Sequence, residues 1–167
     1  MQTRWQYNNV ATKKSAEKRL QRLWHGSRDS ARTPVQWSDE ANAGFTSGTP
    51  WFYVNENYKE VNVAQQENDE NSVLNFYRKA ITLRKELPCV KDGVYKEYGK
   101  NSKTVYTYSR TTADQKMLVI CSFSEQPQQW KAPKGFDMNT AQLVLANYEN
   151  TDTNTLKPYE ARVYLWK

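Results

Sequence analysis

The clearest pattern in the chain is an alternation of apolar and polar side chains that begins after Pro88. Six short stretches keep a period of two, which is the period of a half-buried β-strand. They cover residues 94–98, 104–109, 117–123, 128–131, 142–146 and 160–166, with polar turns between them. The stretch 117–123 is apolar on both faces and is predicted to be a central strand. The pattern predicts an antiparallel sandwich or barrel of about eighty residues.

A helical period precedes the strands. Residues 71–87 place apolar side chains on one face at the spacing of an amphipathic helix. Asn71 or Ser72 can cap its N-terminus, and Pro88 ends it. The face consists of Val73, Leu74, Tyr77, Ala80 and Ile81. A second helix is predicted over residues 11–24, where Lys and Arg surround a narrow apolar stripe.

Residues 27–70 keep neither period, and Pro34, Gly44, Gly48 and Pro50 interrupt them. Such a long segment without regular structure is uncommon inside a compact domain. It is usually functional or ordered by other parts of the protein.

Composition narrows the class of protein. Of the 167 residues, 38% are hydrophobic and 13% aromatic, which favours a folded chain over a disordered one. The formal charge of +6 comes entirely from residues 1–34, which hold eight basic and two acidic side chains. That segment is either a solvated basic helix or a nucleic-acid surface.

Several classes of site are not supported. The two cysteines, Cys89 and Cys121, have no metal-ligand spacing, so neither a metal nor another cofactor is predicted. The single histidine, His25, ends a predicted helix and is interpreted as a capping or surface residue, not as a base. Met1 to Val10 is polar, and no apolar run has the length of a membrane span. We therefore expect a cytoplasmic protein without a membrane partner.

The charged side chains of the aperiodic segment are its most distinctive feature. Arg28 and Arg32 each present a fork of donors that can bridge a carboxylate and a ligand hydroxyl. Asp29 is expected to stay ionised between these two guanidinium groups, which suits an ion pair or a hydroxyl acceptor and not a general acid. Asp39 and Glu40 lie in a polar turn. From the residues alone, the arginines either line a polar pocket or pin the loop through backbone carbonyls.

Six blocks of the sequence, in this order, resemble the C-terminal third of the α-glucosidases of glycoside hydrolase family thirteen. The subgroup that looks most similar is oligo-1,6-glucosidase, with dextran glucosidase, trehalose-6-phosphate hydrolase and sucrose isomerase as near relatives. The resemblance covers residues 15–167. The blocks are SRDSARTPVQW (27–37), NAGF (42–45), PW (50–51), VNENYKEVNV (54–63), NSVLNFYRKAITLRKEL (71–87) and LKPYEARVYLW (156–166).

The resemblance implies a fold that is mostly β with helices, the last part of a (β/α)8 barrel followed by an antiparallel β-sandwich. Residues 1–87 would be the remnant of the catalytic barrel, made of the excursion after its last strand and its final helix, 71–87. Residues 88–167 would be the C-terminal sandwich. Loops at the C-terminal ends of barrel strands build the active site, which would explain the aperiodic segment.

The family hydrolyses α-glucosides with retention, using two aspartates and a glutamate whose motifs this sequence lacks. The resemblance therefore implies no catalytic residue here and no hydrolysis by this chain alone. It implies a substrate-binding role for Arg28, with Asp29 and Arg32 beside it, toward α-linked glucose oligosaccharides. Val35 replaces the usual Met of the block. Linkage preference depends on strands outside the chain, so it stays open.

Two other classes of function compete with this interpretation. One is a free-standing carbohydrate-binding β-sandwich, with Trp130, Trp166 and the tyrosines as a platform. The other is a nucleic-acid-binding module formed by residues 1–34, which the resemblance does not favour. If the barrel is absent, the apolar face of helix 71–87 must pack on residues 1–60, on the sandwich or on a second copy of the chain.

Overall fold

A computed structural model describes residues 17–18, 20–21, 26, 28, 31–149, 152 and 154–167. The chain divides into two compact units, Met1–Ser72 and Val73–Lys167. The predicted helix over residues 11–24 falls largely outside the described residues. No helix within the described ranges combines the length and apolar character that a membrane span requires.

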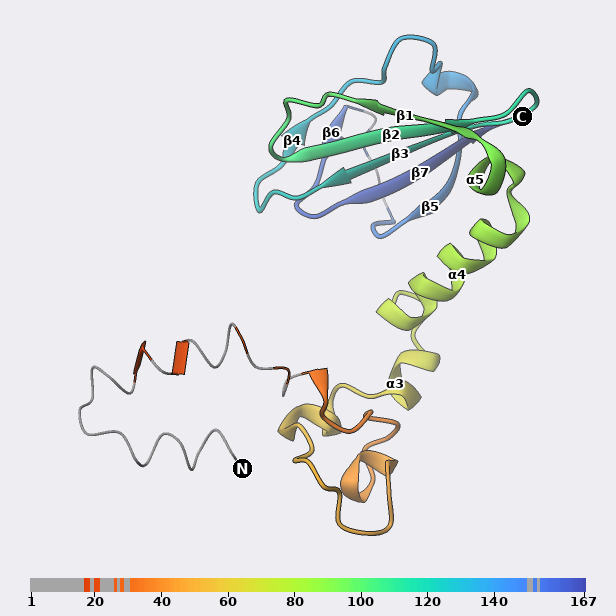
Figure 1. Ribbon diagram of the computed structural model, residues 1–167. Helices are drawn as coiled ribbons and strands as arrows, with labels where there is room; N and C mark the ends of the chain where they lie inside the picture. The colour runs from red at the N-terminus through yellow and green to blue at the C-terminus, as the bar shows by residue number, and fades with distance from the viewer. Residues whose placement is uncertain are drawn as a thin grey trace. The chain divides into compact units, whose positions relative to one another are not determined.

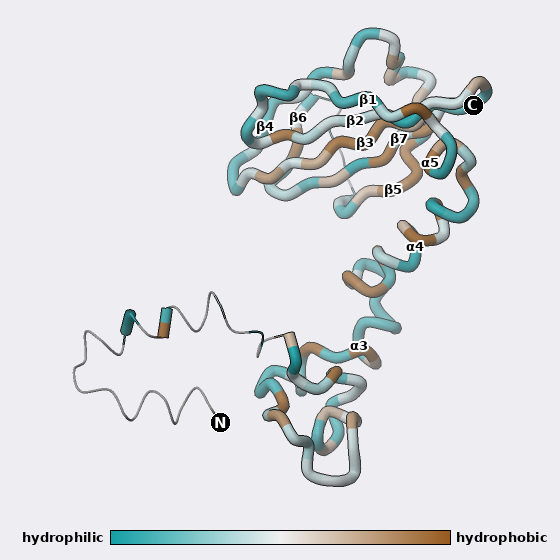
Figure 2. The backbone as a smooth tube through the Cα atoms, in the orientation of Figure 1, coloured by the Kyte–Doolittle hydropathy of each residue, from teal (hydrophilic) through white to brown (hydrophobic). Residues whose placement is uncertain are grey.

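The second unit is built around a five-stranded antiparallel sheet with the order β1-β2-β3-β7-β5 (Figure 1). Its strands are β1 (Val94–Tyr98), β2 (Val105–Thr111), β3 (Lys116–Ser122), β7 (Ala161–Trp166) and β5 (Gln142–Ala146). The apolar run lies on β3, the middle strand, as predicted, and Figure 2 shows its hydrophobic colouring. Val119 pairs with Tyr108 of β2 and with Val163 of β7.

A two-stranded antiparallel sheet forms the other layer of the sandwich. It pairs β4 (Gln128–Gln129) with β6 (Thr155–Leu156). Strand β4 is shorter than the predicted stretch, and β6 was not predicted, since a strand of two residues shows no detectable period. A short 3-10 helix, η4 (Met138–Thr140), lies between β4 and β5.

Alternation along the strands sorts their side chains into two apolar clusters on opposite faces of the large sheet. One cluster lies between the layers and joins Leu118 and Ile120 of β3 to Leu156 of β6. The other joins Met117 and Val119 of β3 to residues outside the sheet. The fold is thus mostly antiparallel sheet with few helices, as expected.

Two helices precede the sheet in this unit. Helix α4 (Val73–Glu86) confirms the predicted helix, and it ends before Pro88. Pro88 also occupies the first turn of a further helix, α5 (Pro88–Asp92). The sequence prediction missed this helix. Pro suits this position because its missing N–H has no partner there. Helix α5 contributes the buried Cys89 to the second apolar cluster.

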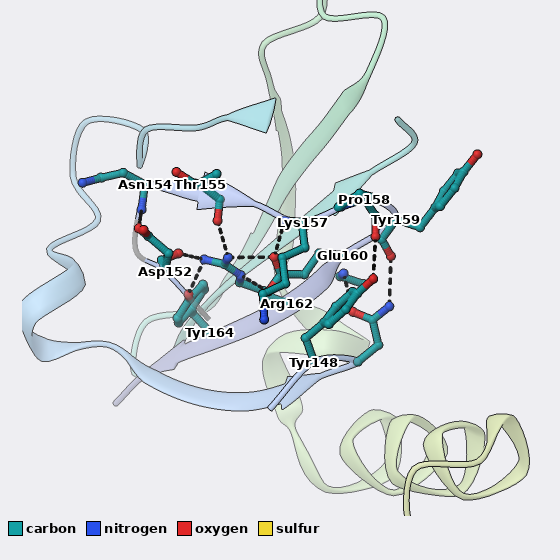
Figure 3. A network of polar contacts seen from close by, with 12 residues as sticks. Tyr148, Asp152, Asn154, Thr155, Lys157, Pro158, Tyr159, Glu160, Arg162 and Tyr164 are labelled. Carbon is teal, nitrogen blue, oxygen red and sulfur yellow. Dashed lines mark hydrogen bonds and ion pairs between the residues drawn. The ribbon is translucent and has the colours of Figure 1, made fainter. Parts of the chain in front are cut away.

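A buried polar network around Arg162 links the two layers (Figure 3). Arg162 of β7 and Glu160 are both fully buried, with 2.8 Å between Arg162 Nε and Glu160 Oε1. Arg162 also donates to the backbone oxygen of Thr155 in β6, at 2.6 Å, and to that of Asp152. Because buried charges are stable only when paired and hydrogen-bonded, this network favours one arrangement of the two sheets.

Residues 33–72 of the first unit form short helices joined by turns. These are the 3-10 helices η2 (Ala41–Gly44) and η3 (Glu56–Lys59) and the α-helix α3 (Val63–Glu67). The buried side chain of Asn62 caps α3 by accepting from the backbone N–H of Gln65 at 2.9 Å. The segment therefore shows no hydrophobic periodicity because it is a folded loop region whose helices are only one or two turns long.

Candidate functional site

The segment that carries the predicted site is held by a side-chain clamp. Asn55 Nδ2 donates to Thr33 Oγ1 at 3.1 Å and to Gln36 Oε1 at 3.2 Å. Gln36 Nε2 donates in turn to Asn57 Oδ1 at 3.3 Å and to the backbone oxygen of Val61. The clamp joins Thr-Pro-Val-Gln-Trp (33–37) to the segment 54–63, two blocks that are far apart in the sequence.

Backbone hydrogen bonds reinforce the clamp. The N–H of Val63 donates to the carbonyl of Gln36 at 2.9 Å, and the N–H of Ala64 to that of Trp37 at 3.0 Å. The start of α3 is therefore fastened to the same block. Such multiple fixation is what a binding loop needs to hold side chains in one orientation.

A left-handed backbone run follows directly. Asn42, Ala43 and Gly44 have φ values of 52°, 57° and 65°, a conformation that only Gly adopts without cost. The carbonyl of Ala43 accepts from the N–H groups of Trp37 and Ser38, at 2.9 and 3.1 Å. The Asn42 amide donates to the carbonyls of Thr46 and Gly48, at 3.1 and 2.9 Å. Backbone of this kind persists where surrounding contacts hold it, and it is common at binding sites.

The two candidate arginines lie just before the clamp. Arg28 and Arg32 are both exposed, and the N–H of Ala31 donates to the carbonyl of Arg28 at 3.1 Å, which turns the chain between them. In the described part of the chain, neither guanidinium donates to a carbonyl or pairs with a carboxylate. Asp29, the third predicted site residue, lies outside the described residues.

The other groups considered from the sequence do not form a reactive centre. Asp39 and Glu40 are exposed, and Lys59 Nζ donates to the backbone oxygen of Asp39 at 2.6 Å. Burial raises the pKa of the Cys89 and Cys121 thiols, so neither is an activated nucleophile. Within the described ranges, no group of His, Cys, Asp and Glu side chains is placed to hold a metal ion.

Several aromatic rings of the first unit face solvent. Trp51 is 79% exposed, and its ring meets that of Phe52 edge to face at 5.5 Å. Trp37, Phe45 and Tyr53 are also exposed. Together with the arginines, these rings provide hydrogen-bond donors and apolar faces, the two kinds of surface that bind a sugar ring.

The two tryptophans proposed as a platform on the sandwich differ in their surroundings. Trp166 donates its indole N–H to the backbone oxygen of Asp137 at 3.0 Å, and its ring packs edge to face with Phe136 at 5.2 Å. Trp166 is therefore part of the fold. Trp130 instead lines a cavity between the layers, which the sequence prediction did not identify.

Comparison with known proteins establishes the family. Residues 1–93 match the alpha-amylase catalytic domain, and the chain belongs to that family. The match ends directly before the first strand of the sandwich. The order of clamp, α4 and sandwich is consistent with the end of a catalytic barrel followed by an antiparallel β-sandwich.

Three relatives illustrate the range within the family. An oligo-1,6-glucosidase of Parageobacillus thermoglucosidasius is 40% identical over 150 residues, 87% of this chain and 27% of that protein. The structure of a trehalose-6-phosphate hydrolase of Bacillus licheniformis is 36% identical, with a TM-score of 0.84, over 96% of this chain and 30% of that one. An isomaltulose synthase of Klebsiella sp. LX3 is 38% identical, with a TM-score of 0.74, over 83% and 26%. The chain thus spans less than a third of the length of each.

Proposed function

We propose that this chain is the C-terminal part of a retaining α-glucosidase that removes glucose from the non-reducing end of short α-glucosides. Residues 1–87 contribute to the catalytic barrel, and residues 88–167 form its C-terminal sandwich. Arg28, Asp29 and Arg32 form one wall of the glucose pocket, with Arg28 donating to sugar hydroxyls. The observation that carries the proposal is the clamped block 33–37, which follows two exposed arginines without a partner in the described part of the chain.

The chain by itself does not hydrolyse α-glucosides in this proposal. Glycoside hydrolysis by retention needs two carboxyl groups about 5–5.5 Å apart across the scissile bond. The described carboxylates in and beside the clamp, Asp39, Glu40, Glu56 and Glu60, are all exposed to solvent. Incubation of the chain with isomaltose should release no glucose, and measurable turnover would contradict this part of the proposal.

A chimera tests the role of Arg28. This chain replaces the matched segment of the Parageobacillus oligo-1,6-glucosidase, and the product should hydrolyse isomaltose. Arg28→Lys in the chimera should lower kcat/KM by about 10- to 100-fold, because a lysine cannot reproduce the two-pronged contact of a guanidinium. Steady-state kinetics measure the change.

Arg84→Lys is the matched control, since Arg84 is an exposed arginine in the last turn of α4. It should leave kcat/KM within about twofold of the parent chimera. A folded chimera without activity, or equal losses for Arg28→Lys and Arg84→Lys, would refute the assignment.

Two further properties belong to the same proposal. The protein works in the cytoplasm, which the free thiols of Cys89 and Cys121 support, because reducing compartments keep cysteines unpaired. The chain taken alone associates with a second copy through α4. Val73, Tyr77 and Ile81 lie on one stripe of that helix and are 70%, 64% and 47% exposed, so the sandwich does not cover them.

A further inference from the structure

The sandwich contains a cavity of about 290 Å³, and every residue that lines it belongs to the second unit. It opens between the end of the large sheet formed by β1 and β2 and the segment that begins with β4. Its walls include Tyr98 at the end of β1 and Trp130 directly after β4. This volume is near the lower end of the roughly 300–1,000 Å³ typical of ligand pockets, and it suits one or two sugar rings.

Hydrogen bonds within the sandwich fix the polar lining. Thr104 Oγ1 donates to Gln128 Oε1 at 2.7 Å, and Gln128 Nε2 donates to Ser124 Oγ at 3.0 Å. Tyr98 Oη and Ser109 Oγ are 3.2 Å apart and share a hydrogen bond. The side chains on both sides of the cavity are therefore oriented before any ligand enters, which lowers the entropic cost of binding.

Three consecutive lining residues keep unused hydrogen-bonding capacity. Gln129 Nε2 donates to Thr155 Oγ1 at 3.2 Å, whereas Gln129 Oε1 has no protein partner among the described residues. The same holds, across the described part of the chain, for the indole N–H of Trp130 and for Lys131 Nζ. The residues that line the cavity thus include an acceptor, two donors and a large aromatic ring.

The charge of the lining restricts the class of ligand. Among the described residues that line the cavity, Lys131 alone carries a charge, and the other polar side chains are amides and hydroxyls. A single flexible ammonium group is a weak basis for binding a phosphate, which favours several donors or a guanidinium. Neutral hydroxyl groups of a sugar fit the amides, and the C–H face of a pyranose ring fits an indole.

We propose that this cavity is a second sugar-binding site, which holds one or two units of a neutral α-linked glucose oligosaccharide against Trp130. The choice of glucose rests on the proposed function, whereas the preference for a neutral polyhydroxyl ligand rests on the lining alone. The site performs no chemistry. It anchors an oligosaccharide on the sandwich through residues of the second unit alone.

Nuclear magnetic resonance titration of the 167-residue chain with isomaltotriose tests the proposal. Saturable shifts are expected for the amides of residues 98–105 and 128–132 and for the Trp130 indole, with millimolar affinity. Trp130→Ala should weaken binding by about tenfold or more, since truncation of an aromatic anchor removes most of its contact. A parallel titration with inorganic phosphate should produce no saturable shift in these residues.

Trp130 also packs against the cluster between the layers, so Trp130→Ala could lose binding because the sandwich unfolds. A second variant outside this cluster separates the two effects. Gln129 is exposed, and Gln129→Ala should weaken isomaltotriose binding several-fold, whereas Gln126→Ala, an exposed glutamine outside the lining, should not. The sandwich shifts should persist in Arg28→Lys, which separates this site from the proposed active site. Shifts confined to residues 28–63, saturation by phosphate alone, or equal affinities of the Gln129 and Gln126 variants would overturn the proposal.

Discussion

Arg162 is the largest fully buried side chain among the described residues, and its partner Glu160 is buried as completely. Burial alone would raise the pKa of Glu160, but the hydrogen bond from Arg162, that from the Lys157 N–H and the nearby positive charges together outweigh it. The pKa of Glu160 therefore lies below its ordinary value. A carboxylate with a lowered pKa stabilises the fold above its unfolded-state pKa, and this stabilisation is lost as the pH falls toward the folded-state value.

Glu160→Gln tests this account. Near neutral pH the substitution should lower the free energy of unfolding by about 3 kcal/mol, because it leaves the Arg162 guanidinium buried without its counter-charge. Between about pH 6 and pH 3, the stability of the variant should fall less steeply than that of the parent. Urea unfolding across this range measures both effects.

Glu125→Gln is the control, since Glu125 is exposed on the same unit. Its unfolding curves should follow those of the parent at every pH. An identical loss of stability in the two glutamine variants would show that the buried pair does not stabilise the sandwich.

At the scale of elements, the clamp between segments 33–37 and 54–63 depends on the tight turn at η2. Gly44 has a positive φ, and a Cβ added there would lie 2.5 Å from Ser38 Oγ. The turn returns the carbonyl of Ala43 to the N–H groups of Trp37 and Ser38. Strain in η2 should therefore be transmitted to the block that follows Arg32.

Gly44→Ala should destabilise the first unit by about 1–2 kcal/mol, the cost of a left-handed residue with a side chain. Gly48→Ala is the matched control, because its Cβ would meet Thr46 Oγ1 at an ordinary 3.7 Å and its φ is not in the left-handed region. Hydrogen exchange of the Val63 and Ala64 amides measures the effect. Equal exchange rates in both variants would contradict the transmission of strain to the clamp.

For the whole molecule, the proposed self-association concerns the exposed face of α4. Val73, Tyr77 and Ile81 form a continuous exposed stripe, and burial of apolar surface yields about 25 cal/mol per Å². The chain spans less than a third of its relatives, and α4 lies within the residues that match the catalytic domain. A face of this kind favours association in the isolated chain.

Light scattering should detect a concentration-dependent increase in mass for the parent chain. Ile81→Glu should shift it toward the monomer, because a buried charge opposes association. Thr82→Glu, an exposed neighbour off the stripe, is the control and should keep the parent behaviour. A monomeric parent at all concentrations would refute self-association through α4.

Most regular elements could be predicted from the sequence. The alternation after Pro88 located five strands to within two residues at each end, and it also indicated β4. Helix 71–87 was recognised because its apolar spacing and its caps are local signals. Prediction failed for β6, α3 and α5, which have two to five residues each, too few to show a period.

The candidate sites were less predictable. Arg28 and Arg32 stood out because two guanidinium groups in an aperiodic loop are unusual. The Gln36–Asn55 clamp and the lining formed by Tyr98 and Trp130 have no sequence signal, since each joins residues about twenty or more positions apart. The burial of Arg162 could not be predicted either, because the residues of its strand show an ordinary alternation of apolar and polar side chains.

Neighbouring positions were enough to locate the longer strands and the long helix, because a strand has a period of two and a helix a period of 3.6. The sequence also determined the order of the family's blocks. Folding alone decides which polar side chains are buried, paired or available to a ligand. That decision depends on contacts between distant segments, and so Arg162 became part of the core while Trp130 became the wall of a cavity.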